Sequence, residues 1–418
     1  MHNLLVYLSQ LFALAGGGGS SSGGGGGGGG SSDWGYYGSD STSSSPISLA
    51  VSLIFAIIMI GVFIWLHFRA KQLKAEKARQ LTASMALARG GDEMWNKELI
   101  EKLARDLFPR YQQSWQNFDM LDIRKFTTPE YASHVNLMLL AMKQMHRKNV
   151  VSEISLQSVA VIDFEDHPDN RLDRMTVEYT GSARDSLVDT VSDQQIFSKI
   201  VHFTEYWHFS RVGNSWILNS ISQSTESAEM THGHMMKFAK ANDMYFSPDW
   251  GSLLLPVGGE LFKHGFDSTD INNHIIGYWQ GDLLVQIYTY SYRPGEDARE
   301  YHIVGQISLP KTYGGILVER VDERKSKRWR APVGYELVST EWGDFNQRYK
   351  VYATDRNQVV SLELLNPGFM AWLYDQNLRC NIEVIGNSVF FSSRVSSNQG
   401  RYPEMLEILK RSYKELKM

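Results

Sequence analysis

The sequence predicts an α+β protein in which a single transmembrane helix precedes two folded domains. A stretch of 23 residues, Pro46 to Phe68, contains no Asp, Glu, Lys or Arg. Apolar residues recur every three or four positions between Met94 and Lys148, which is the period of helices. From Ser152 onward the period changes to two, which is typical of strands. Helices followed by a run of antiparallel strands indicate helices packed on one face of a sheet.

Length and composition set limits on the kind of protein. The 418 residues leave enough sequence after the apolar stretch for two domains of ordinary size. The net charge of −4 gives no electrostatic indication of a nucleic-acid-binding protein, so we expect no DNA partner. One cysteine, Cys380, excludes an intramolecular disulfide and favours a reducing compartment for the folded part.

The first 45 residues suggest a secretory start and a tether. Residues 1–15 form an apolar run that ends in Ala13-Leu14-Ala15, the small-x-small pattern of a signal-peptidase site. No Lys or Arg precedes the run, so a cleaved signal peptide, an uncleaved anchor and a short interfacial helix all remain open. Residues 16–45 are rich in Gly and Ser, and we expect them to be a disordered tether.

The apolar stretch Pro46–Phe68 predicts a membrane-spanning helix. As a helix it is about 34 Å long, slightly more than a hydrocarbon core of about 30 Å. The basic residues that follow it are Arg69, Lys71, Lys74, Lys77 and Arg79. By the positive-inside rule the C-terminal part is cytoplasmic and the N-terminus lies outside the cell membrane. These basic residues, in a helix and linker over residues 69–93, either contact anionic headgroups or form a solvated flank.

Residues 94–226 predict the first domain. A stripe of apolar residues indicates its first helix: Trp95, Leu99, Leu103, Leu107, Tyr111, Trp115 and Phe118. A second helix starts after Thr128, which is a suitable cap before Pro129 in the first turn. Strands follow, and the last two form a hairpin closed at Gly213-Asn214.

This layout resembles the Tim-forty-four-like domain over about residues 94–225. The resemblance rests on two helices followed by strands, and on the segments Phe203–Arg211, Trp216–Leu218 and Ile221–Gln223. The family occurs in a mitochondrial import subunit, a mitochondrial ribosomal protein and many bacterial membrane proteins. It implies a cone-shaped, nuclear-transport-factor-two-like fold that encloses an apolar pocket. It also implies a docking or scaffold role beside a membrane.

Residues 227–418 predict a second α+β domain. Helices are expected at 234–241 and 403–416, and the strand-like runs are 274–292, 300–309, 314–321, 335–339, 348–355 and 380–395. This part resembles an uncharacterised bacterial domain of membrane-tethered proteins. The motif that carries this resemblance is Phe345-Asn346-x-Arg348-Tyr349, followed by Asp355 and Pro367. No activity is implied by that resemblance.

Aromatic residues of the first domain are the candidate binding site. Alternation places Phe203, Glu205, Trp207 and Phe209 on one face of a strand, and Trp216 lies on the next strand. They form either the core between sheet and helices or a pocket for an acyl chain or a partner's hydrophobic segment. A second candidate is the basic segment 319–332. Its residues Arg324, Lys325, Lys327 and Arg328 belong to an exposed loop or bind lipid phosphates.

No constellation of catalytic residues stands out. The histidines 202, 208, 232 and 234 have no Cys or acidic pair at metal-ligand spacing, and Asp163, Glu165 and Asp166 fall in a predicted turn. We therefore expect no metal, no cofactor and no enzymatic activity. The sequence favours a membrane-anchored scaffold or binding protein, in protein translocation or membrane-associated assembly, whose partners are the bilayer and a protein at its cytoplasmic face. The alternative is an enzyme or carrier that uses the apolar pocket for a small lipophilic ligand.

Overall fold

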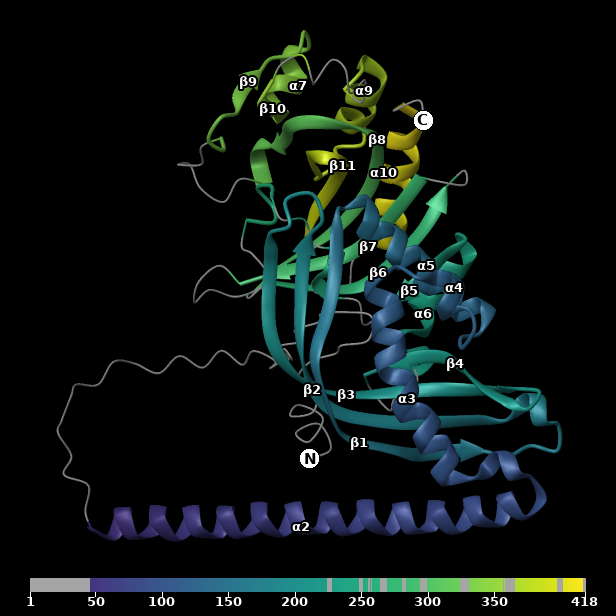
Figure 1. Ribbon diagram of the computed structural model, residues 1–418. Helices are drawn as coiled ribbons and strands as arrows, with labels where there is room; N and C mark the ends of the chain where they lie inside the picture. Colours follow the sequence, from purple (N-terminus) through teal and green to yellow (C-terminus); the bar gives the residue numbers. More distant parts are fainter. Residues whose placement is uncertain are drawn as a thin grey trace.

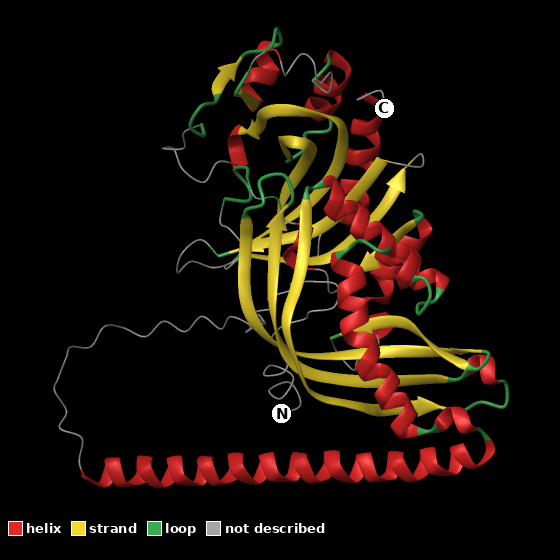
Figure 2. Ribbon diagram, viewed as in Figure 1, coloured by secondary structure: helices red, strands yellow, loops and turns green. Residues whose placement is uncertain are grey.

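A computed structural model of the chain describes residues 46–415, apart from 224–227, 248–250, 255, 257, 264–268, 280–282, 294–298, 324–330, 356, 358–364 and 397–400. Helices and strands are mixed in this part, and its strands form two antiparallel sheets (Figures 1 and 2). The α+β fold class predicted from the sequence is therefore confirmed.

A single helix, α2 (Pro46–Gly91), leads into the folded body. At about 1.5 Å per residue its 46 residues span roughly 69 Å. The helix continues to Gly91, and Asp92 then caps the short helix η1 (Glu93–Trp95) by accepting a hydrogen bond from the backbone N–H of Met94. Near the end of α2, Met85 is buried in the same apolar cluster as Trp95. This end of the helix is therefore fixed to the body by packing.

The membrane span predicted at 46–68 gains no support from the described residues. Among them no helix is both long enough and apolar enough to cross a membrane. The side chains of residues 46–61, 63, 64 and 67 lie outside the description, as do the predicted signal peptide (1–15) and tether (16–45).

The helices of the first domain are α3 (Lys97–Gln116), α4 (Met120–Ile123) and α5 (Pro129–Gln144). Thr128 accepts a hydrogen bond from the N–H of Tyr131, and Pro129 occupies the first turn of α5, as predicted. The apolar stripe of α3 was predicted wrongly at two positions. Leu99 and Leu103 are 62% and 41% exposed, whereas Ile100 and Ala104 face the core. The buried stripe is thus displaced by one residue over the first turns.

The first sheet has the order β1-β2-β3-β4, with strands Arg147–Glu165, Arg174–Asp189, Gln195–Val212 and Ser215–Ser222. Its long strands bend strongly (Figure 1), and β1 carries three register irregularities against β2 between Ser152 and Asp163. Such bulges bend a strand and increase its twist. The predicted hairpin turn is confirmed, because Gly213 adopts a φ of +59° between β3 and β4.

The second sheet contains β5 (Met244–Ser247), β6 (Thr269–Trp279), β7 (Leu283–Tyr292), β8 (Glu300–Arg320), β9 (Glu336–Val338), β10 (Tyr349–Ala353) and β11 (Asn381–Val395). The order is β5-β6-β7-β8-β10-β9, and β11 also pairs with β8. The two strands predicted at 300–309 and 314–321 are one continuous strand, β8. Its first half pairs with β7 and its second half with β10, while β11 follows both halves.

Helices cover one face of the second sheet. They are α6 (Ala228–Ala241), α7 (Gly343–Arg348), α9 (Pro367–Asp375) and α10 (Tyr402–Glu415). Gly305 of β8 allows α10 to approach closely, because a Cβ there would lie only 2.7 Å from the sulfur of Met405. The opposite face of this sheet lies against the first domain. One apolar cluster spans the junction and includes Val135, Met138, Leu253, Leu254 and Ile276.

Candidate functional site

The aromatic residues predicted as a pocket lie in a closely packed part of the first domain. Along β3, residues 203, 205, 207 and 209 are buried, whereas the intervening residues 204, 206 and 208 are partly exposed, as the alternation predicted. The ring of Trp207 lies 5.4 Å from Phe108, 5.3 Å from Tyr111 and 4.7 Å from Tyr179, measured between centroids. Trp207 and Phe209 are both fully buried.

The polar atoms of this aromatic group have partners. The indole N–H of Trp207 donates to the carboxylate of Glu205 at 3.0 Å, and the hydroxyl of Tyr179 donates to the carbonyl of Ala104 at 2.9 Å. Trp216 donates to the carbonyl of Met94 at 3.1 Å, and its ring packs in a tilted arrangement against Trp95 with 4.9 Å between centroids. Burial, reinforced by the Glu205 charge, raises the pKa of Tyr179. These residues thus form core, and the apolar pocket stays a prediction without a described opening.

The face of the second sheet that meets the first domain is buried but polar. Its side chains come from alternate positions of β7 and β8, and Gln286 lies directly opposite Gln306 in the register. Each is at most 5% exposed: Gln286, Tyr288, Tyr290, Gln306 and Ser308. We call these five residues the inter-sheet cluster. The sequence analysis missed it, since alternating aromatic residues are equally typical of a core strand.

Residues of the first domain, and the loop after β5, border the inter-sheet cluster. The guanidinium of Arg147 donates to the carbonyl of Leu253 at 3.0 Å, and it is close enough to Tyr288 for each to affect the pKa of the other. Burial lowers the pKa of Arg147 to about 10. The side-chain amide of Gln306 points to the sulfur of Met145 at 3.9 Å.

Two buried histidines lie at the same junction. His134 of α5 stacks on Tyr245 with 5.3 Å between ring centroids, and burial together with nearby His274 lowers its pKa to about 3. His274 of β6 pairs through Nε2 with the Oε1 of Gln286 at 2.8 Å. Burial, opposed by that hydrogen bond, lowers the pKa of His274 to about 4. Both side chains are therefore neutral at pH 7.

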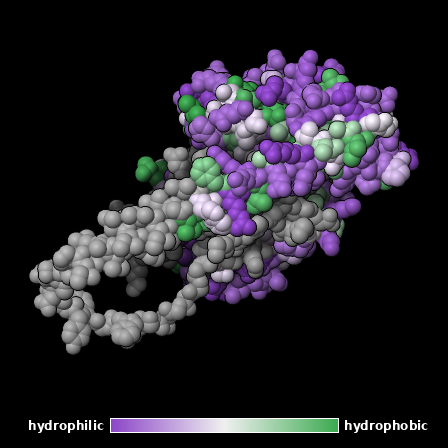
Figure 3. All heavy atoms as spheres, turned by 90° about the horizontal axis from the view of Figure 1, so that it is seen from below, coloured by the Kyte–Doolittle hydropathy of each residue, from purple (hydrophilic) through white to green (hydrophobic). Residues whose placement is uncertain are grey.

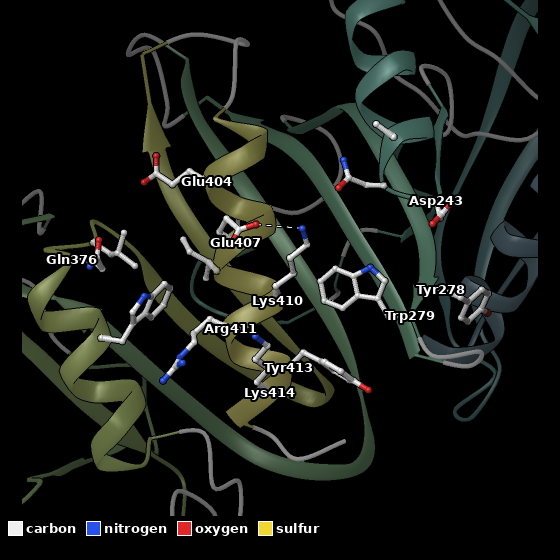
Figure 4. A pocket seen from close by; sticks show the side chains of 15 residues that line it. Asp243, Tyr278, Trp279, Gln376, Glu404, Glu407, Lys410, Arg411, Tyr413 and Lys414 are labelled. Carbon is white, nitrogen blue, oxygen red and sulfur yellow. Dashed lines mark hydrogen bonds and ion pairs between the residues drawn. The ribbon is translucent and has the colours of Figure 1, made fainter.

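A groove lies on the outer side of the second sheet. It has a volume of about 920 Å³ and lies between the end of α6, the end of β6, α9 and α10 (Figure 4). Four aromatic side chains line it: Tyr278, Trp279, Trp372 and Tyr413. Trp279 and Tyr413 meet edge to face at 5.9 Å. We call this concavity the α10 groove.

Charged residues of both signs border the α10 groove. Figure 4 shows the ion pair between Lys410 and Glu407, whose atoms are 3.3 Å apart. Arg411 pairs with Glu415 at 2.6 Å. These pairs are three and four residues apart on one helix, so they add a little to the stability of α10 beside the aromatic side chains.

Basic residues predicted to touch the membrane are only partly described. Arg69, Lys71, Lys77 and Arg79 are exposed on α2. The side chains of Lys74 and of residues 324, 325, 327 and 328 lie outside the described residues. In the same basic segment, Arg320 is buried and donates to the carbonyls of Asn377 and Leu378, so it holds the fold together.

The histidines considered as metal ligands are not brought together. His208 is engaged at both ring nitrogens, by Thr176 at 3.0 Å and by Ser222 at 2.9 Å, while His202 is exposed. His232 packs on Phe246. Over the described part of the chain no group of three or more His, Cys, Asp or Glu residues is suited to hold a metal ion. Cys380 is buried, which raises the pKa of its thiol to about 12.

The residues that carried the resemblance of the second domain have structural roles. Phe345 and Tyr349 are fully buried and stack at 4.9 Å. Asn346 accepts a hydrogen bond from the N–H of Thr340, and Arg348 lies 3.7 Å over the ring of Tyr374. Pro367 begins α9. This motif therefore specifies the α7-β10-α9 layer.

Comparisons with known proteins give limited information. No protein family matches the sequence, and no curated protein matches it. The mycobacterial trehalose monomycolate transport factor A, TtfA, is similar in structure at 13% identity over 44% of this chain and 91% of that chain, with a TM-score of 0.33. An Ntf2-like protein involved in plasmid conjugation is similar at 13% identity over 52% of this chain and 92% of that chain, with a TM-score of 0.21.

A third similar structure is the intermembrane space region of the chloroplast protein ARC6, at 12% identity over 29% of this chain and 93% of that chain, with a TM-score of 0.24. All three TM-scores are below 0.5, so we assign neither family nor function from them. One neighbour is described as Ntf2-like, which is the coarse fold expected for the first domain. The Tim-forty-four-like resemblance itself is not confirmed.

Proposed function

We propose that this protein is a tethered, non-catalytic scaffold whose body binds a partner protein in the α10 groove. The groove is the observation that carries this proposal, because it combines four aromatic side chains with surrounding charged residues. Aromatic residues and Arg are enriched at the centres of protein interfaces, while a polar border keeps the free surface soluble. In this proposal residues 94–226 are a cone domain of the Tim-forty-four-like type that serves as a rigid support.

The tether in this proposal is α2, attached to the cell membrane through residues 46–68 with the body on the cytoplasmic side. Its described side chains support a contact with lipid, because the large apolar ones are exposed: Val62, Trp65, Leu66, Phe68 and Leu73. Water is an unfavourable environment for such a series. The described surface in Figure 3, by contrast, is mostly hydrophilic, with apolar atoms in small separate areas. Arg69 and Lys71 would then lie at the headgroups.

A binding role suits the described side chains better than a catalytic one. Three ionisable groups that line the α10 groove are engaged in ion pairs along one helix: Glu407 pairs with Lys410, and Arg411 pairs with Glu415 outside the lining. The aromatic group around Trp207 is filled by its own rings, so the alternative of a carrier for a lipophilic ligand has less support.

Site-specific photo-crosslinking in the native membrane tests the partner. A crosslinking amino acid is placed at Gln376, which is exposed in the groove, or at Leu337, which is exposed on β9 outside it. We expect one discrete crosslinked protein from position 376 and none from position 337. Adding Trp279→Ala should reduce the yield at position 376 at least fivefold. Equal crosslinking from both positions, or a yield unaffected by Trp279→Ala, would contradict the proposal.

Protease protection tests the orientation separately. If protease added outside intact cells digests the body, the body is not cytoplasmic and that part of the proposal is wrong. Digestion only after the cells are opened supports it.

A further inference from the structure

The inter-sheet cluster presents several polar atoms without partners. Within the part of the chain that the structure describes, no protein atom hydrogen-bonds to the Nε2 of Gln286, the hydroxyls of Tyr288 and Tyr290, the Oε1 of Gln306 or the Oγ of Ser308. All five side chains are more than nine-tenths buried and project from one face of β7 and β8. Buried polar groups in native proteins are almost always bonded to protein, water or ligand.

These unpartnered atoms are not spread at random. On the other face of β7 the hydroxyls of Thr289 and Ser291 have partners: Thr289 contacts the hydroxyl of Tyr402 on α10 at 2.9 Å, and Ser291 accepts from Arg299 at 2.9 Å. The hydroxyl of Tyr402 also donates to the carbonyl of Asn273 at 3.0 Å. Leaving a buried polar group unbonded costs free energy, and five of them together would strongly oppose this packing. A guest that bonds to them removes that cost.

The chemistry of the cluster defines the guest. The amide of Gln286 donates hydrogen bonds, the two tyrosines donate or accept, and Gln306 and Ser308 supply acceptors. The positive charge of Arg147 lies beside Tyr288. The ring of Phe262 closes the other end, edge to face against Tyr290 at 5.1 Å. The loop that carries Phe262 is held by the carboxylate of Glu383, which accepts the N–H groups of Glu260 and Leu261.

We propose that the inter-sheet cluster is a closed binding site for a small organic acid. Its carboxylate lies near Arg147 and Tyr288, and its remaining polar groups lie along Tyr290, Gln306 and Ser308. Because the site is between the two sheets, the acid links the first domain to the second. This site is separate from the α10 groove, so the two proposals can fail independently.

Thermal unfolding of the purified full chain in detergent tests the site, with succinate, citrate and glutamate as probes. The controls are neutral succinamide and sodium chloride at the same ionic strength. We expect at least one acid to raise Tm by about 2 °C at tenfold its Kd, and the controls to leave Tm unchanged. Tyr288→Phe and Tyr290→Phe should each lower the Tm of the loaded chain and abolish the shift. Tyr402→Phe, which removes a bonded hydroxyl on the other face, should lower Tm but keep the shift.

Three outcomes would overturn the proposal. If Tyr288→Phe and Tyr290→Phe keep the full rise in Tm on adding the acid, the acid does not bond to these hydroxyls. If the acids stabilise all variants equally, their effect is a general salt effect or arises elsewhere. If none of the three acids shifts Tm of the unmutated chain although both substitutions lower it, the cluster holds only water.

Discussion

Two buried sheet faces of this protein look alike in sequence and differ in their chemistry. On β3, alternate residues Phe203, Trp207 and Phe209 pack against helices. On β7, alternate residues Tyr288 and Tyr290 are equally buried. The difference lies in the polar atoms, since Trp207 donates to Glu205 whereas the hydroxyls of Tyr288 and Tyr290 have no partner among the described residues. Burial and aromatic content therefore do not separate a core from a site, but the bonding of polar atoms does.

The largest expected effect concerns the packed face. Trp207→Ala should lower the free energy of unfolding by about 4–5 kcal/mol, because it removes a fully buried ring and leaves a cavity among Phe108, Tyr111 and Tyr179. Urea denaturation followed by circular dichroism measures this loss. Trp279→Ala, in the open α10 groove, is the control and should cost less than half as much. A loss below about 1 kcal/mol for Trp207→Ala would mean that β3 lines a pocket after all.

A smaller effect is expected at an ion network beside the packed face. Arg211 of β3 donates to Asp173 at 3.0 Å and also to Asp92, so it ties the sheet to the junction of α2 and η1. Arg211→Met leaves the fully buried Asp173 without this cation and should cost about 3 kcal/mol in urea unfolding. Arg184→Met, which breaks the exposed pair with Glu153, is the control and should change nothing measurable. If Arg211→Met and Arg184→Met lower the free energy of unfolding by the same amount, the buried carboxylate of Asp173 is not stabilised by Arg211.

Local features of the fold were predictable from the sequence. Thr128 with Pro129 marks a helix start, Gly213 marks a hairpin, and the period of two along β3 assigns its buried face, because each depends on neighbouring residues. The displaced stripe of α3 was not predictable from period alone. Leu99 and Ile100 are both apolar, and only the position of the sheet decides which of them is buried.

The inter-sheet cluster could not be predicted, because it depends on contacts between distant parts of the chain. Arg147 meets Leu253 across 106 residues, and Asn387 donates to the carbonyl of Gln144 across 243 residues. Nothing in the spacing of Tyr288 and Tyr290 indicates that their hydroxyls find no partner among the described residues. The α10 groove is similar, since helices α9 and α10 and strand β6 form it together.

The buried histidines make the stability of the junction between the two sheets depend on pH, and this dependence can be measured. The pKa of His134 is lowered to about 3 in the folded state, while an unfolded histidine titrates near 6.5. Below pH 6.5 the unfolded chain therefore binds the extra proton, so stability is full above that pH and falls as the pH decreases toward 3. Between pH 7 and pH 5 the unmutated chain should lose about 2 kcal/mol more than His134→Phe, as measured by urea unfolding.

The carboxyl group of Glu383 titrates in the same pH range as His134, but its contribution to stability changes with pH in the opposite direction. Burial raises the pKa of Glu383 to about 7, so its contribution makes the fold more stable as the pH falls from 7 toward 4.5. Both chains contain Glu383, and its effect cancels in the difference between them. Identical pH profiles for the two chains would show that His134 is not buried neutral at the junction.

The smallest expected effect compares one hydroxyl on each face. Tyr179 donates its hydroxyl to the carbonyl of Ala104 and keeps its ring contact with Trp207 when the oxygen is removed. Tyr179→Phe should therefore cost about 1 kcal/mol, the ordinary net value of one hydrogen bond, at every concentration of organic acid. Tyr290→Phe should differ, because its cost in urea unfolding should rise as succinate or the other effective acid is added. If the two costs respond to the acid in the same way, the two buried faces do not differ in the manner inferred from their polar atoms.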